Sequence, residues 1–178
     1  MVKSKAEIRK SAKSAVKSLS IDQKASKSAL IFKRILELDS IKDAKCVALY
    51  ASLPDEVYSL EAVEYLSDSK RVLLPRVCGD DMDFYPYLAG SLSTGAFGIS
   101  EPQVGQAVCP AEIDVIVVPG VAFSAEGKRL GRGKGYYDRY MSRDGFRATK
   151  VGVCYAEQIA DDIPTEQHDI TMDCVIFG

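Results

Sequence analysis

The stretch VIVVPGVAFSAEGKRLGRGKGYYD, residues 115–138, joins an apolar run to a glycine-rich, cationic loop. Residues 113–118 are mostly apolar, as expected of a central strand in a parallel sheet that is covered on both faces. In the loop, Gly131, Gly133 and Gly135 alternate with cationic residues. Glycine lets backbone N–H groups approach a ligand closely, and N–H groups at the start of a helix bind anions. The stretch therefore predicts an α/β fold with an anion site at the end of this strand.

The charge of the loop indicates which anion it binds. Residues 127–139 carry a net charge of +4, in a chain whose formal net charge is −2. A polyphosphate with a metal ion at Asp138 fits this loop better than any other ligand class. The loop is not a Walker A loop, because Gly135 follows Lys134, and it is not a dinucleotide fingerprint, because Tyr136 stands where a glycine is required. The sequence has no protein-kinase motif either.

Hydrophobic periodicity organises the rest of the chain. Amphipathic spacing and a capping box at Ser20 to Gln23 predict two basic N-terminal helices within about residues 3–38. Shorter helices are expected at 58–67 and 135–141, and a long loop at 90–112. The expected strands are 45–51, 71–77, 82–88 (paired with its predecessor across 79–81), 113–118, 149–154 and 171–177. This alternation predicts a single domain over residues 1–178, a three-layer sandwich around a mostly parallel, Rossmann-like sheet.

Composition excludes several classes of function. The five cysteines are widely spaced, which is typical of reduced thiols and predicts a cytoplasmic protein. The single histidine, His168, excludes a multi-histidine metal site and weakens any Ser-His or Cys-His triad. No apolar run approaches the ~18 residues of a membrane-spanning helix, and residues 1–20 lack the apolar core of a secretory signal. Residues 1–34 carry a net charge of +8, which leaves a basic-armed nucleic-acid-binding module as the weaker alternative.

The chain resembles the 5-formyltetrahydrofolate cyclo-ligase family, also called 5,10-methenyltetrahydrofolate synthetases. The most specific part of the resemblance is the run from Val118 to Phe123 followed by the loop at 127–138. Shorter landmarks follow the family's order and cover nearly the whole chain. They are Lys5-x-x-x-Arg9, Leu53-Pro-x-Glu56, Leu74-Pro-Arg-Val77, Met82-x-Phe84, Phe97-Gly-Ile-x-Glu-Pro102, and His168-Asp169 followed by Asp173.

The resemblance implies an ATP- and Mg²⁺-dependent ring closure. ATP would phosphorylate the formyl oxygen of 5-formyltetrahydrofolate, N10 would attack the activated carbon, and phosphate would leave to give 5,10-methenyltetrahydrofolate. Such an enzyme needs positioning and charge neutralisation, with no covalent nucleophile. Its partners would be small molecules, without nucleic acid or membrane, and we expect a monomer. An ATP-dependent phosphotransferase or ligase that acts on another small molecule is the first alternative.

The resemblance also implies roles for individual residues. Lys134 and Arg132 would be catalytic, because they neutralise charge on the transferred phosphoryl group. Asp138 and Asp169 would bind Mg²⁺, which takes one or two carboxylates together with phosphates and water. The residues implied to bind ATP are Lys5, Arg9, Arg129, Leu130, Gly131, Arg132, Gly133, Lys134, Gly135, Tyr136 and Tyr137. Those implied to bind the folate are Ala51, Tyr136 and Glu56, the last as acceptor for the pterin.

Without the resemblance, several of these residues have structural readings that stay open. Lys5 and Arg9 lie one helical turn apart and could form a solvated helix face. Asp138 could be a carboxylate favoured by the dipole at a helix N-terminus. Glu56 could be a turn residue that follows Pro54. The sequence alone therefore supports the anion-binding loop more strongly than it supports any single residue outside it.

Overall fold

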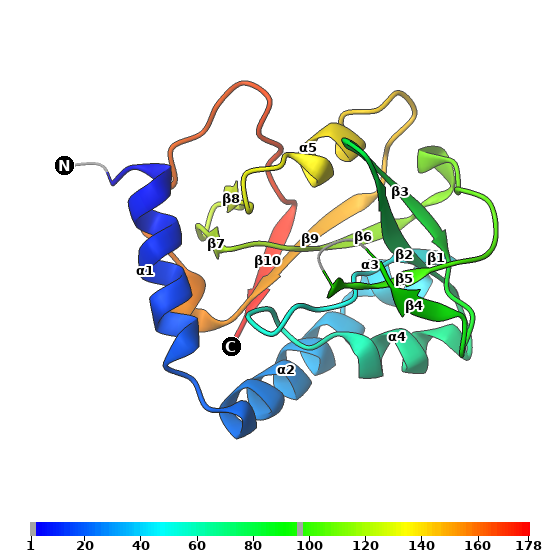
Figure 1. The fold of residues 1–178 in the computed structure, drawn as a ribbon, viewed down its shortest axis with the longest axis horizontal. Helices are drawn as coiled ribbons and strands as arrows, with labels where there is room; N and C mark the ends of the chain where they lie inside the picture. Colours follow the sequence, from blue (N-terminus) through cyan, green and yellow to red (C-terminus); the bar gives the residue numbers. More distant parts are fainter. Residues whose placement is uncertain (1–2, 96–97) are drawn as a thin grey trace.

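A six-stranded sheet forms the centre of the computed structural model, which describes residues 3–95 and 98–178 (Figure 1). The strand order is β10-β9-β6-β1-β2-β3, and β3 is the one strand of this sheet that runs antiparallel to its neighbour. The expected α/β fold with a mostly parallel sheet is confirmed. The strands are β1 (Cys46–Ala48), β2 (Arg71–Cys78), β3 (Asp81–Pro86), β6 (Val115–Pro119), β9 (Thr149–Cys154) and β10 (Cys174–Phe177).

Strand order also fixes where a ligand can bind. The chain extends the sheet from β1 through β2 to β3 on one side, and then returns to place β6, β9 and β10 on the other. The connections after β1 and β6 therefore leave the sheet in opposite directions. This is the switch point of a doubly wound sheet, where a crevice opens at the carboxyl ends of the strands. The glycine loop follows β6 and so belongs to this crevice.

Helices cover both faces of the sheet. They are α1 (Lys5–Lys17), α2 (Ile21–Leu36), α3 (Asp39–Asp43), α4 (Leu60–Ser67) and α5 (Tyr136–Met141). Because side chains alternate along a strand, β6 contributes to two cores. Val115 and Val117 pack with residues of α2 and α4, whereas Ile116 and Val118 pack with residues of α5. The apolar run of β6 is thus buried on both faces, as its composition predicts.

The N-terminal helices begin at capping boxes. Ser20 and Gln23 form the predicted box before α2, and Ser4 and Glu7 form another before α1. Ile8 of α1 lies in a small cluster that includes residues on both sides of the glycine loop, among them Val121, Ala122, Leu130 and Ile163. This packing holds the first turns of α1 beside the glycine loop, at the carboxyl ends of the strands. None of the helices among the described residues is both long and apolar enough to cross a membrane.

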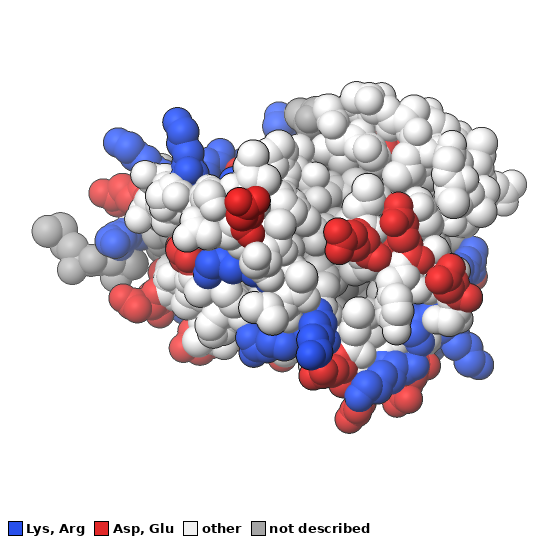
Figure 2. Space-filling model, turned by 90° about the horizontal axis from the view of Figure 1, so that it is seen from below, with Lys and Arg blue, Asp and Glu red and all other residues white. Residues whose placement is uncertain are grey.

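Charges of both signs are mixed on the face of the molecule seen from below (Figure 2). Lys and Arg side chains lie beside Asp and Glu side chains there, and they do not form one continuous basic surface in that view. Proteins bind the phosphate backbone of nucleic acids mainly through continuous basic surfaces. This face therefore gives the nucleic-acid alternative no added support.

Several short elements differ from the sequence expectations. The segment expected to be a loop at 90–112 contains the hairpin β4 (Leu92–Thr94) and β5 (Ser100–Pro102) and a 3₁₀ turn at Pro110–Glu112. The glycine loop begins in another hairpin, β7 (Ala122–Phe123) with β8 (Arg129–Leu130). Strand β1 is shorter than the 45–51 expected, β10 begins at Cys174, and α3 was not expected. Strands of two or three residues are too short to show a period of two, which explains why the two hairpins were not predicted.

Helix boundaries differ only slightly from expectation, with α1 at 5–17 and α4 beginning at 60. Such differences of one or two residues are normal at frayed helix ends. Phe97 of the family landmark lies outside the described residues.

Gly127 ties the glycine loop to the C-terminal segment. Its φ is +91°, its carbonyl oxygen accepts the N–H of Met172 at 2.9 Å, and a Cβ added here would collide with the Met172 carbonyl oxygen. We expect Gly127→Ala to lower the free energy of unfolding by roughly 2–3 kcal/mol. Gly79→Ala is the matched control, with φ +61° and open space around the added carbon, and should cost about 1 kcal/mol. Urea unfolding measures both, and equal losses would contradict the prediction.

Candidate active site

A cavity of about 740 Å³ opens at the carboxyl ends of β1 and β6. The segment after β1, the glycine loop, the first turns of α1 and the segment before β10 all contribute to its wall. Every residue to which the resemblance gives a role lies on this wall. They are Lys5, Arg9, Ala51, Glu56, Arg129, Leu130, Gly131, Arg132, Gly133, Lys134, Gly135, Tyr136, Tyr137, Asp138 and Asp169. Residues that are far apart in the sequence thus meet in one space of the size that small molecules occupy.

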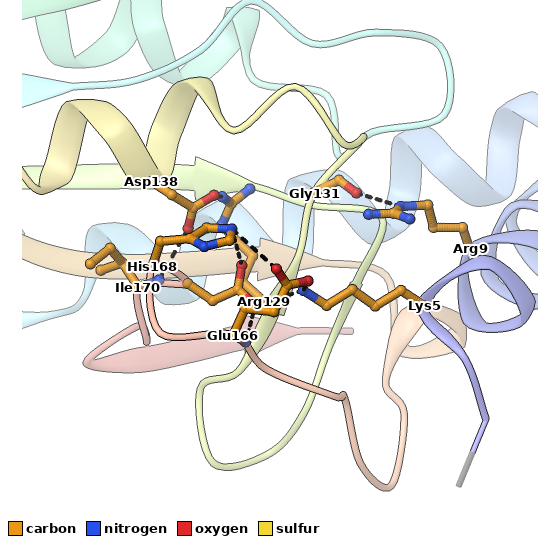
Figure 3. Close-up of polar contacts among 9 residues, drawn as sticks. Lys5, Arg9, Arg129, Gly131, Asp138, Glu166, His168 and Ile170 are labelled. Atoms are coloured by element: carbon orange, nitrogen blue, oxygen red, sulfur yellow. Dashed lines mark hydrogen bonds and ion pairs between the residues drawn. The ribbon is translucent and has the colours of Figure 1, made fainter.

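Lys5 joins α1 to the segment before β10. Its Nζ donates to Asp169 Oδ2 at 2.7 Å and to Glu166 Oε1 at 2.8 Å (Figure 3). Burial alone would lower the pKa of Lys5, but the hydrogen bonds to the two carboxylates outweigh burial and raise that pKa. At Asp169, burial alone would raise the pKa, but the hydrogen bonds from Lys5 and from the Glu166 N–H hold it below its usual range. Both groups are therefore charged at neutral pH.

Arg9 lies one turn further along α1 and contacts the glycine loop. Its Nε donates to the carbonyl oxygen of Gly131 at 2.9 Å (Figure 3). Gly133, with φ +100°, is close by, and an added Cβ there would lie 3.9 Å from an Arg9 guanidinium nitrogen. Both α1 cations predicted to bind ATP thus line the cavity, and both also position the segments around it. The structural reading as a solvated helix face is wrong for this pair.

Arg129 and Asp138 form the most buried ion pair of the cavity wall. Arg129 Nη2 lies 2.5 Å from Asp138 Oδ2, and the two side chains are 4% and 13% exposed. Asp138 Oδ1 accepts the Ile170 N–H at 3.1 Å, so protein donors occupy both oxygens of this carboxylate. The Nε of Arg129 is buried with no hydrogen-bond partner among the described residues. Arg129 is therefore a buried, ion-paired residue of the loop and differs from the exposed loop cations that could reach a phosphate directly.

Two ion pairs of Arg132 link the glycine loop to the segment after β1. Arg132 Nη2 lies 2.6 Å from Asp55 Oδ1 and 3.0 Å from Glu56 Oε1. Glu56 is buried, and its other oxygen accepts the Leu53 N–H at 2.9 Å. Arg132 and Glu56 were assigned to different ligands, ATP and the pterin. A ligand that engages either of them must compete with their mutual contact.

Lys134 is the loop cation best placed for an anion. Its side chain is exposed and forms no ion pair with any residue in the described ranges, although the residue lines the cavity. Its carbonyl oxygen accepts Arg139 Nη1 at 2.7 Å, which fixes the backbone just before α5. Gly135 caps α5 with φ +68°. Tyr136 donates its hydroxyl to the Gly79 carbonyl oxygen at 3.1 Å, so α5 is also tied to the β2–β3 turn.

Several residues of the cavity wall had no role predicted from the sequence. Glu101 on β5 belongs to a family landmark and is 4% exposed. Glu166 bonds Lys5 and had no distinguishing signal in the sequence, because it lies in a polar loop. Tyr50 is buried and donates its hydroxyl to the Val57 carbonyl oxygen at 2.6 Å. Within residues 3–95 and 98–178, no three or more His, Cys, Asp or Glu side chains gather in a way that could hold a metal ion.

Glu56 should make stability depend on pH. Burial raises its pKa above 4.5, and the hydrogen bond from Leu53 and the charge of Arg132 offset burial only in part. An acid whose pKa is raised by folding stabilises the fold below its unfolded pKa, and this contribution is lost as pH rises through the folded-state pKa. Gln copies the protonated form. We therefore expect the free energy of unfolding of Glu56→Gln, relative to the unmodified protein, to increase as pH rises from about 4 to about 7.

Urea unfolding at a series of pH values measures this difference. Glu61→Gln on the exposed side of α4 is the control, for which we expect little change across the same range. A Glu56→Gln difference that is constant or that decreases with pH would contradict the prediction.

Comparison with known proteins places the chain in a family. The model of the 5-formyltetrahydrofolate cyclo-ligase family matches residues 1–178. The 5-formyltetrahydrofolate cyclo-ligase of Saccharomyces cerevisiae is 32% identical over 199 residues, which cover 96% of this chain and 93% of the relative. The 5,10-methenyltetrahydrofolate synthetase of Aquifex aeolicus has a TM-score of 0.88 at 37% identity, covering 97% of this chain and 89% of that one. The enzyme of the same name from Mycoplasma pneumoniae has a TM-score of 0.79 at 27% identity, covering 97% of each chain. This chain belongs to the 5-formyltetrahydrofolate cyclo-ligase family.

Proposed function

We propose that the protein catalyses the ATP- and Mg²⁺-dependent cyclisation of 5-formyltetrahydrofolate to 5,10-methenyltetrahydrofolate, with release of ADP and phosphate. The observation that carries this proposal is that the cationic glycine loop and the buried Glu56 line one and the same cavity. The loop suits an anionic polyphosphate, and the carboxylate suits a ring system with N–H donors. Membership of the cyclo-ligase family supports the same pair of substrates.

The chemistry requires little of the protein beyond positioning. A formyl amide is a poor electrophile and its oxygen a poor leaving group, so transfer of the γ-phosphoryl group to that oxygen solves both problems. N10 then attacks the carbon, and the oxygen leaves as phosphate. Lys134 and Arg132 would neutralise charge on the transferred group, while the backbone N–H groups of the loop hold the phosphates. Glu56 would accept hydrogen bonds from the 2-amino group and the adjacent ring N–H of the pterin.

The carboxylates of the wall fit a magnesium ion that is bound mainly through ATP. Magnesium takes oxygen ligands and often keeps several waters beside one or two carboxylates. Asp169 uses Oδ2 for Lys5 and the Glu166 N–H, and its Oδ1 accepts no hydrogen bond from the described part of the chain. Asp138 can take part only if it shares or exchanges the donors that now occupy both of its oxygens. The ion would neutralise phosphate charge, and Asp169 is the better placed of the two ligands.

Absorbance of the methenyl product tests the proposal. Purified protein would be mixed with 5-formyltetrahydrofolate, Mg²⁺ and ATP, and with the same mixture lacking ATP or lacking Mg²⁺. We expect a rise in the methenyl band that requires both. If ATP binds but no rise occurs, the acceptor is a different small molecule. If ATP does not bind at all, the assignment of the glycine loop is wrong.

A further inference from the structure

Glu101 is a buried carboxylate of the cavity wall that has no role in the proposal above. It lies on β5, which packs against β2, and the residue is 4% exposed. Its Oε1 accepts the Val77 N–H at 3.2 Å, and Gly95 crosses so close to Oε2 that any Cβ there would collide with this carboxylate. The hairpin of β4 and β5 thus fixes the side chain in one place.

Glu101 differs from the other buried carboxylates of the cavity because it lacks a cation. Glu56 contacts Arg132 and Asp138 contacts Arg129, whereas Glu101 forms no salt bridge within the described ranges. Its Oε2 accepts no hydrogen bond from the described residues, and Glu101 lines the cavity. A ligand with an N–H donor would therefore supply the missing partner.

The positions of the charges separate the two ends of the cavity. Lys5, Arg9 and Lys134 lie on α1 and the glycine loop, where the polyphosphate is expected. Glu56 follows β1, and Glu101 lies beside β2, on the side of the sheet away from β6. Glu56, which contacts Arg132 of the glycine loop, and Glu101 both line the cavity that would receive the pterin. If Glu56 takes the 2-amino group and the adjacent N3–H, the remaining ring donor of 5-formyltetrahydrofolate is N8–H, because N5 carries the formyl group.

We propose that Glu101 is a second substrate-binding carboxylate, which accepts a hydrogen bond from N8–H of the reduced pterin. This inference rests on the proposed function, since it takes the folate as the occupant of the cavity. It also gives Glu101 a role in specificity. The oxidised pterin of folic acid has a lone pair at N8 in place of the N–H, and a lone pair facing a carboxylate is repelled. A site built around a hydrogen-bonded N–H rejects analogues that lack it.

Calorimetric titration without ATP tests the inference, with 5-formyltetrahydrofolate and folic acid as ligands. Glu101→Gln keeps the acceptor for Val77 and removes the charge. We expect it to weaken 5-formyltetrahydrofolate binding about tenfold while folic acid binding weakens less than about twofold or improves. The dissociation constant for folic acid divided by that for 5-formyltetrahydrofolate gives a ratio in which effects common to both ligands cancel. Glu101→Gln should lower this ratio. Glu112→Gln, whose exposed carboxylate pairs with Arg71 away from the cavity, is the control and should leave the ratio unchanged.

Thermal unfolding separates this role from a structural one. A substrate-binding carboxylate without a cation should be replaceable by Gln with an equal or higher melting temperature, whereas a structural carboxylate would lower it and leave the ratio unchanged. If Glu101→Gln does not fold, Glu101→Asp keeps the charge and shortens its reach, and it should lower the same ratio. An unchanged ratio in a folded variant would overturn the inference alone. Failure of the unmodified protein to bind 5-formyltetrahydrofolate would overturn both the inference and the proposed function.

Discussion

Lys134→Ala should lower kcat by about 10²- to 10³-fold and leave the melting temperature within about 2 °C. The lysine is exposed, lines the cavity and has no ion-pair partner in the described chain, so the fold loses little when its side chain is removed. Its charge, by contrast, is available to a phosphoryl group that gains negative charge as it is transferred. The methenyl absorbance assay and thermal unfolding measure the two effects on the same sample.

Lys128→Ala is the matched control for this experiment. Lys128 belongs to the same loop but does not line the cavity, and its Nζ lies 2.5 Å from Asp162 Oδ1. We expect its removal to change kcat less than about twofold. A fall in kcat with an unchanged KM for ATP would place the Lys134 contact in the transition state, whereas a rise in KM alone would place it in ground-state binding. Unchanged kinetics in Lys134→Ala would reject the assignment of the loop.

The central sheet and the position of the glycine loop after β6 could be predicted because their signals are local. The run Val115–Pro119 is apolar throughout, which indicates burial on both faces, and the glycines of the following loop have no role in a regular element. The capping box at Ser20 and Gln23 fixes the start of α2 from four consecutive residues. The hairpin of β4 and β5 gave no such signal, since three-residue strands are held by their packing on β2 and not by their own pattern.

The pairing of charges in the site could not be predicted, because it depends on contacts between distant segments. Arg129 and Arg132 are both loop cations three residues apart, yet one is buried against Asp138 and the other reaches Glu56, 76 residues away in the chain. The difference arises from β8, which turns Arg129 inward before the chain leaves the hairpin. The burial of Glu101 could not be predicted either, because it arises from the contacts of its carboxylate with Gly95 and with the Val77 N–H.

Asp138→Asn should lower the free energy of unfolding by about 3–5 kcal/mol, because it leaves the buried guanidinium of Arg129 without its counter-ion. Asp169→Asn should cost less than about 1 kcal/mol. Its partner Lys5 keeps Glu166 and is 22% exposed, and ion pairs in contact with water contribute little. Urea unfolding in the absence of nucleotide and Mg²⁺ measures both variants under the same conditions. Equal costs, or a larger cost at Asp169, would contradict the prediction.

This comparison separates two aspartates to which the resemblance gave the same role, the binding of Mg²⁺. If Asp138 acts chiefly as the counter-ion of Arg129, the double variant Arg129→Met with Asp138→Asn should recover part of the stability lost in Asp138→Asn, because no charge is then left buried alone. If Asp169 is the better magnesium ligand, its Asn variant should need more Mg²⁺ for half-maximal activity while remaining as stable as the unmodified protein. The two carboxylates are similarly exposed and differ in their partners: Asp138 uses both oxygens and pairs with a buried arginine, whereas Asp169 uses only Oδ2 and pairs with a partly exposed lysine.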